Sequence, residues 1–172
     1  MGAGVRKLML AVHLTCSVGW LGALIAYVVL DLAVASSNDP HVVRAAWIGM
    51  GLVTASAIVP LAATSLLTGI AIAAGTKWGL FRHWWVLISL ALTVFAVVVL
   101  LSETRLIAHA ADLATDPTTS ATDLLALPST LLHSVGGLVV LLVIQVLNVY
   151  KPQGLTPYGW RKLQAERDQR AD

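Results

Sequence analysis

Four long runs of uncharged, mostly apolar residues constrain this chain more than any other feature. They cover residues 8–30, 45–74, 84–102 and 129–150. About 20 consecutive apolar residues suffice to cross the hydrocarbon core of a bilayer as a helix. A membrane β-barrel would instead need strands that alternate apolar and polar residues, and these runs lack that alternation. The sequence therefore predicts an all-α protein, a bundle of four transmembrane helices.

The composition excludes a water-soluble fold. The 172 residues are 58% hydrophobic and 12% charged, whereas about a quarter of the residues in an ordinary soluble domain are charged. A chain this short has too much surface to hide so many apolar side chains from water. Its net charge of +2, spread over both ends, gives no basic face for nucleic acid. We expect residues 1–150 to lie in a lipid bilayer and residues 151–172 to form a polar tail.

Basic residues are distributed unevenly between the two sides that four spans define. Of the 11 lysines and arginines, only Arg44 and Arg105 fall on the side opposite the termini. The loop at 75–83, with Lys77 and Arg82, lies on the same side as the termini. Because cytoplasmic loops are enriched in Lys and Arg, we expect a multi-pass protein of the cytoplasmic membrane with both termini inside.

Histidines are the polar residues that stand out within the spans. A rise of 1.5 Å per residue puts His13 about 8 Å from the inner end of its span, and His133 about 7 Å from the outer end of its own. With about 30 Å of hydrocarbon, these two levels are roughly 15 Å apart. A metal–nitrogen bond is only about 2 Å long, so one metal ion does not reach both. Each histidine needs a partner at its own level: His83 for His13, and His109 or His41 for His133.

Two stacked sites of this kind are typical of small b-type cytochromes, in which haem lies between helices and histidines are its axial ligands. Gly136 and Gly137 lie one turn deeper than His133 and leave room for a flat cofactor, and Gly22 does the same after His13. The alternative is that these glycines only allow helices to pack closely.

A copper site is a second hypothesis. Met9, His13 and Cys16 share one face of the first span, and thioether, imidazole and thiolate ligands together suit Cu(I). Methionine and cysteine are also common apolar fillers. A third hypothesis is a non-catalytic subunit that pairs with another membrane protein, and the sequence leaves the oligomeric state open.

Other polar positions have simpler interpretations. Asp31 ends the first span and is expected to cap it, and Pro60 predicts a kink in the second span whose freed carbonyls are bonded by hydroxyls on the following turns. Glu103 and Arg105 are expected to be solvated charges at the membrane interface. The segment at 108–128 is expected to be an exterior loop.

The string HLTCSVGWLGAL, which begins at His13, places Trp20 and Gly22 in a His-x6-Trp-x-Gly pattern. This pattern resembles the first helix of the copper-resistance D family (CopD) and of HemJ-type membrane proteins, which have four to eight helices. The resemblance implies that His13 is associated with haem or another metal. The strings TKWGLFRHWWVL at 76–87 and VYKPQGLTPYGW at 149–160 also resemble uncharacterised actinobacterial integral membrane proteins.

The sequence thus leads to the prediction of a membrane protein that binds one or two haem b groups. We expect it to pass electrons between a membrane quinone pool and a redox partner protein at one face, with copper handling as the alternative. The residues expected to bind or line the haem sites are His13, His83, His109, His133, Trp20, Gly22, Gly136 and Gly137.

Overall fold

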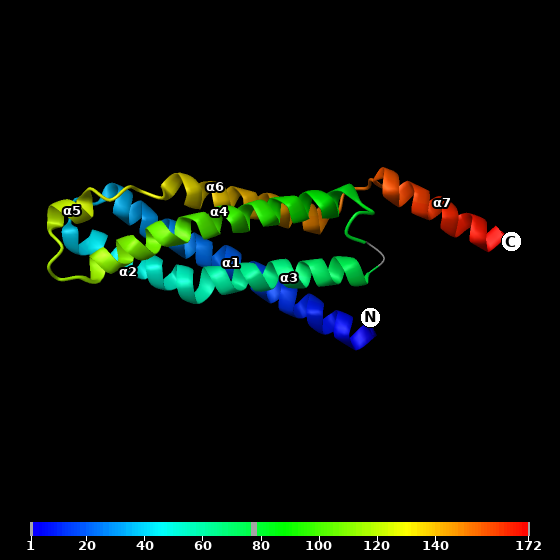
Figure 1. Ribbon diagram of the computed structural model, residues 1–172, viewed down its shortest axis with the longest axis horizontal. Helices are drawn as coiled ribbons and strands as arrows, with labels where there is room; N and C mark the ends of the chain where they lie inside the picture. The colour runs from blue at the N-terminus through cyan, green and yellow to red at the C-terminus, as the bar shows by residue number, and fades with distance from the viewer. Residues whose placement is uncertain (1, 77–78, 172) are drawn as a thin grey trace.

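Four long helical segments lie along one another in the computed structural model, which describes residues 2–76 and 79–171 (Figure 1). Within those residues every regular element is a helix, as predicted. The elements are α1 (Ala3–Ser36), α2 (Pro40–Val53), the π-helical turn η1 (Thr54–Ile58), α3 (Val59–Gly75), α4 (Trp84–Thr115), α5 (Ala121–Leu125), α6 (Leu131–Tyr150) and α7 (Pro157–Ala171). Helices α1, α2–η1–α3, α4 and α6 are long and apolar enough to cross a membrane. The prediction of four spans is thus confirmed by the length and composition of these helices.

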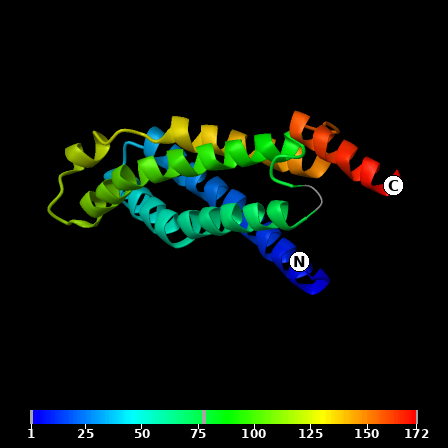
Figure 2. The same cartoon turned by 45° about the vertical axis from the view of Figure 1, so that its right-hand side comes forward.

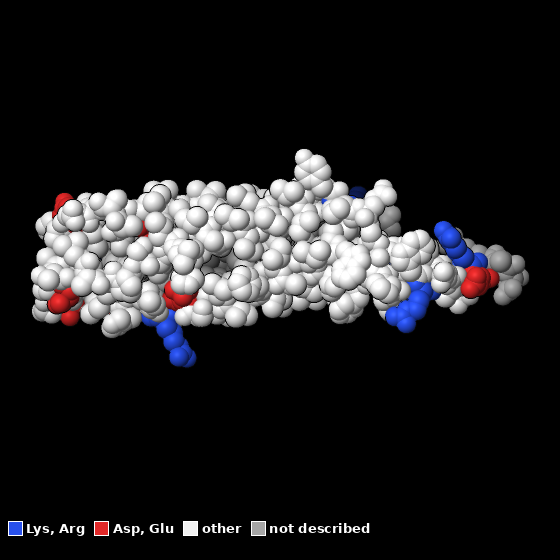
Figure 3. Space-filling model, turned by 90° about the horizontal axis from the view of Figure 1, so that it is seen from above, with Lys and Arg blue, Asp and Glu red and all other residues white. Residues whose placement is uncertain are grey.

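Both ends of the chain lie at the same end of the bundle, and α5 lies at the other end (Figure 1). Helix α1 crosses the other long helices obliquely, and α7 projects beyond the bundle in both ribbon views (Figure 2). Seen from above, most acidic side chains lie toward the α5 end and most basic side chains toward the α7 end, where an acidic side chain is also seen, with an uncharged stretch between the two ends (Figure 3). Lys77 and Trp78, which contributed to the predicted inner loop, lie outside the described residues.

Helix α4 is longer than the sequence predicts. It continues past Ser102 to Thr115, so His109 lies on a helix and the expected loop at 108–128 is wrong in its first part. The end of α4 is stabilised from α2: the guanidinium of Arg44 donates hydrogen bonds to the carbonyls of Ala114 (2.6 Å), Asp116 (2.8 Å) and Thr119 (2.9 Å). Carbonyls at a helix end have no partner within the helix, and a basic side chain supplies one here.

The second span accommodates Pro60 through a wider turn. Proline has no N–H for the carbonyl four residues earlier, and the preceding turn, η1, is a π-helix in which the N–H of Val59 bonds to the carbonyl of Thr54. The hydroxyl of Thr64 donates to the carbonyl of Pro60 itself at 2.8 Å. The expected irregularity is thus present, but it takes the form of a π-turn on the N-terminal side of the proline.

The polar tail contacts the inner loop just before α4. The N–H of Thr156 donates to the carbonyl of Arg82 at 3.1 Å, and the guanidinium of Arg82 forms a bidentate ion pair with Glu166 at 3.1 and 3.0 Å. At Gly159 a Cβ would lie 2.3 Å from the Arg82 carbonyl oxygen, so only glycine allows this approach. Helix α7 is therefore anchored at its start to the loop before α4.

Close helix packing yields a first prediction. A Cβ at Gly51 would lie 2.5 Å from the Cβ of Ala111, whereas a Cβ at Gly22 has no atom within 4 Å. We expect Gly51→Ala to lower the free energy of unfolding by about 1–3 kcal/mol, because α2 and α4 must separate. Unfolding in SDS and mild detergent, followed by circular dichroism, measures it. The matched variant Gly22→Ala should leave that free energy unchanged or slightly raised, and equal losses in both variants would contradict the packing argument.

Candidate functional site

A cavity of about 250 Å³ lies in the half of the bundle near α5, between α1, η1, α4 and α6. Its walls are mainly apolar and include Trp20 on α1 and Gly136 and Gly137 on α6. Its rim includes side chains that point out of the bundle: Phe95 is 58% exposed and Leu132 is 84% exposed. The polar residues of the lining are Tyr27, Thr54, Glu103, Thr130, His133 and Ser134. In a membrane, this cavity opens toward lipid between α4 and α6.

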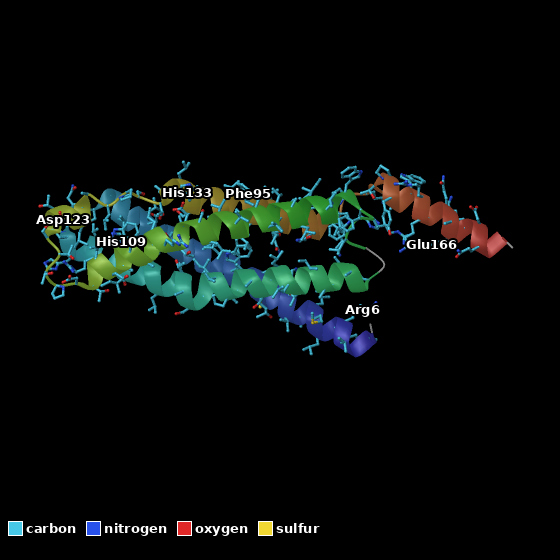
Figure 4. All side chains as sticks on the ribbon, in the orientation of Figure 1. Arg6, Phe95, His109, Asp123, His133 and Glu166 are labelled. Carbon is cyan, nitrogen blue, oxygen red and sulfur yellow. The ribbon has the colours of Figure 1, made fainter. Side chains whose placement is uncertain are left out.

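A carboxylate and an imidazole meet at the rim of the cavity. The Oε1 atom of Glu103 lies 3.7 Å from Nδ1 of His133, and their side chains are 21% and 52% exposed. This separation is longer than a direct hydrogen bond, so both groups keep donor and acceptor positions for a third atom between or beside them. His133 lies near Phe95 along the bundle, whereas His109 lies farther toward α5 (Figure 4). The neighbour that the structure gives His133 is thus a glutamate.

The wall of the cavity contains a hydroxyl without a partner. Thr54 begins η1, is only 4% exposed, and its Oγ1 makes no hydrogen bond. An unsatisfied buried polar group costs about 1–3 kcal/mol, and π-turns are frequent at functional sites. A ligand that accepts a hydrogen bond at this wall would give Thr54 the partner it lacks.

Asp31 is fully buried behind the cavity, and it does not end its helix, because α1 continues to Ser36. Its Oδ2 atom accepts hydrogen bonds from the hydroxyls of Thr130 and Ser134, both at 2.8 Å. Thr130 is also 2.9 Å from the hydroxyl of Tyr27, one turn before Asp31 on α1. Because Thr130 is the N-cap residue of α6, the carboxylate lies at the positive end of that helix dipole. The expected cap of the first span is in fact a link between α1 and the start of α6.

His13 joins α1 to α3 in the other half of the bundle. Its Nδ1 lies 3.0 Å from the carbonyl oxygen of Ser65 and 3.0 Å from Oγ1 of Thr68. A Cβ at Gly69 would come within 3.1 Å of the imidazole, so the ring lies directly on the glycine backbone of α3. The hydroxyl of Ser17 adds a 2.7 Å hydrogen bond to that of Ser65. Interhelical hydrogen bonds of this kind hold membrane helices together.

The predicted histidine pairs have different surroundings in the structure. His83 precedes α4 in the inner loop, where its backbone pairs with Leu155 of the tail, and His41 and His109 are exposed. Across the described part of the chain, no group of three or more His, Cys, Asp or Glu side chains is arranged to hold a metal ion. Ligation of haem or copper by His13, His83, His109 and His133, or by Met9 and Cys16, stays a prediction.

Several predicted residues do converge on one place. Trp20, Gly136, Gly137 and His133 line the cavity together, whereas Gly22 faces open space. Glu103 belongs to the same site although it was expected to be a solvated charge. Its spacing from the lining residues Ala96, Leu100 and Ile107 places all four on one helix face, a signal present in the sequence.

The polar network of α1 and α6 yields a second prediction. Thr130→Val removes the hydroxyl that links Asp31 and Tyr27, so we expect the free energy of unfolding to fall by about 1–3 kcal/mol. Thr54→Val makes the same change at a buried hydroxyl without a partner and should leave that free energy unchanged or raised. Unfolding in SDS and mild detergent compares the two variants, and an equal loss in both would contradict the hydrogen-bond assignment.

Comparisons with protein-family models, with curated proteins and with solved structures find no match for this chain.

Proposed function

We propose that the protein binds a quinone from the membrane in this cavity and passes electrons between the quinone pool and a partner at one face. The observation that carries the proposal is an apolar cavity, open to lipid, with an imidazole–carboxylate pair at its rim and an unpartnered hydroxyl in its wall. A quinone is a flat apolar molecule with a hydrogen-bond acceptor at each end. His133 and Thr54, on different walls, supply the matching donors.

The volume and the lining of the cavity suit a single quinone ring. Ligand pockets usually measure about 300–1,000 Å³, so a cavity of about 250 Å³ suits a single small aromatic headgroup. Gly136 and Gly137 present backbone without side chains, and the indole of Trp20 offers a flat surface for the ring. An isoprenoid tail would leave past Phe95 and Leu132 into the lipid.

Haem is the cofactor implied by the resemblance of the first helix, and the residues that line the cavity fit haem less well than they fit a quinone. Among the described residues that line the cavity, His133 is the one histidine, and its Nδ1 faces Glu103. A haem iron held between two helices usually takes an axial ligand from each side. The cavity is also small for a macrocycle. The proposed reaction therefore does not require haem in the cavity.

We further propose that the protein lies in the cytoplasmic membrane with both termini inside. The two termini share one end of the bundle, and helix α7 and Arg82, which lies just before α4, are at that end. An excess of Lys and Arg favours the cytoplasmic side. The cavity then lies in the outer half of the membrane, near the exterior.

Quinone binding is tested directly in nanodiscs. A short-chain ubiquinone analogue is titrated while intrinsic tryptophan fluorescence is recorded, since Trp20 forms part of the cavity wall. We expect saturable quenching, and His133→Ala and Thr54→Val should each raise the Kd about tenfold, the equivalent of about 1.4 kcal/mol. His41→Ala, at an exposed histidine outside the cavity, is the matched control. Unsaturable quenching, or the same affinity in all four proteins, would sink the proposal.

Orientation is tested by labelling single cysteines in a Cys16→Ser background. Asn38 precedes α2 and Gln164 lies on α7, and both are exposed. A maleimide that does not cross membranes should label Asn38→Cys in intact cells and Gln164→Cys only after the membrane is broken. The reverse pattern would show that the termini are outside.

A further inference from the structure

A directed chain of hydroxyl groups connects the cavity with Asp31. Thr130 has a single hydroxyl proton, which it donates to Oδ2 of Asp31 at 2.8 Å. The 2.9 Å hydrogen bond between Thr130 and Tyr27 must therefore use the proton of Tyr27. The chain runs from the Tyr27 hydroxyl through the Thr130 hydroxyl to the Asp31 carboxylate. Tyr27 and Thr130 line the cavity, and the carboxylate ends the chain behind it.

The carboxylate at the end of this chain has no cation beside it. Salt bridges to Asp31 are absent among the described residues, and its partners on α6 are neutral hydroxyls. Arg44 on α2 is the basic residue closest to Asp31 in the sequence, and its guanidinium donates instead to the carbonyls at the end of α4. The other titratable groups near this row of hydroxyls are Tyr27, which belongs to it, and Glu103 and His133 at the cavity rim. A buried carboxylate without a counter-charge is costly, and an ionisable residue inside a membrane span is therefore a candidate for a function.

We infer that Asp31 receives, through Tyr27 and Thr130, a proton from a quinol that is oxidised in the cavity. This inference rests on the proposed function and names the direction of the reaction. The quinol passes two electrons, one at a time, to a one-electron acceptor at the exterior face, such as a ferric complex or haem protein. Both quinol O–H bonds break, and the products are the quinone, two reduced acceptors and two protons.

Each of the two protons has an acceptor among the residues around the cavity. One passes to the oxygen of Tyr27 while the proton of Tyr27 moves to Thr130 and that of Thr130 moves to Oδ2 of Asp31. The other passes to the Glu103–His133 pair at the rim. The hydroxyl of Ser129, on an exposed residue, donates to Oδ1 of Asp31 at 3.5 Å. It continues the first route toward water once its O–H turns outward and its oxygen accepts the proton held by the Asp31 carboxyl. Asp31 thus acts through Tyr27 and is a positioning residue for proton release.

Two variants separate this role from a purely structural one. Asp31→Asn keeps an oxygen that accepts hydrogen bonds but does not hold the proton, and Tyr27→Phe keeps the ring and removes the first hydroxyl. Tyr150→Phe, at a tyrosine that is 79% exposed, is the matched control. Quinone affinity is measured by fluorescence quenching, and quinol oxidation is measured by stopped flow in nanodiscs with ferricyanide as the acceptor.

We expect Asp31→Asn and Tyr27→Phe to lower the kcat of quinol oxidation at least about tenfold, as loss of a proton-transfer group does. Their quinone Kd should stay within about threefold of the wild type, and Tyr150→Phe should match the wild type in both. If the wild type binds quinone but Asp31→Asn and Tyr27→Phe oxidise quinol as fast as the wild type does, proton transfer to Asp31 is overturned while the proposed function stands. Loss of quinone binding in both variants, or a wild type that binds quinone without oxidising quinol, also overturns it. A wild type that binds no quinone overturns the proposed function itself.

Discussion

The hydrocarbon of a membrane offers polar groups no hydrogen-bond partners, and the rest of this structure depends on that constraint. The backbone satisfies it by forming helices along the whole length of the four spans. Side chains satisfy it by pairing between helices: His13 with Ser65, and Asp31 with Thr130 and Ser134. These contacts fix α1 against α3 in one half of the bundle and against α6 in the other. A polar group that breaks the rule, such as the hydroxyl of Thr54, therefore marks a place where something else is expected to bind.

The two halves of the bundle use polar residues differently. Around His13, imidazole, hydroxyl and carbonyl groups bond to one another across a close contact between α1 and α3, which links the two helices in this half. Nearer α5, the π-turn η1 and the glycines of α6 surround a cavity whose lining combines apolar walls with a few polar groups. A hydrogen-bonded helix contact in one half and an open, partly polar cavity in the other suit a protein that receives a ligand from the lipid.

Local properties could be predicted from the sequence, and contacts between distant residues could not. Each span is a continuous apolar run, so all four were predicted, and the depth of His133 led to a site that Trp20, Gly136 and Gly137 share with it. The end of α4 was misplaced because Arg44, on another helix, stabilises it. The sequence predicts only a cap at Asp31, because the partners of Asp31 are about 100 residues away in the chain. Glu103 was missed because its solvation depends on which face of α4 meets α6, although its spacing carried that information.

Photoaffinity labelling with an azido-quinone in native membranes tests the central claim, that quinone occupies the cavity, most directly. Mass spectrometry of the labelled protein should find the adducts on α4 and α6, at cavity residues such as Phe95 and His133, and excess unlabelled quinone should abolish them. Labelling confined to the lipid-facing side of other helices, or labelling that unlabelled quinone does not reduce, would contradict the account.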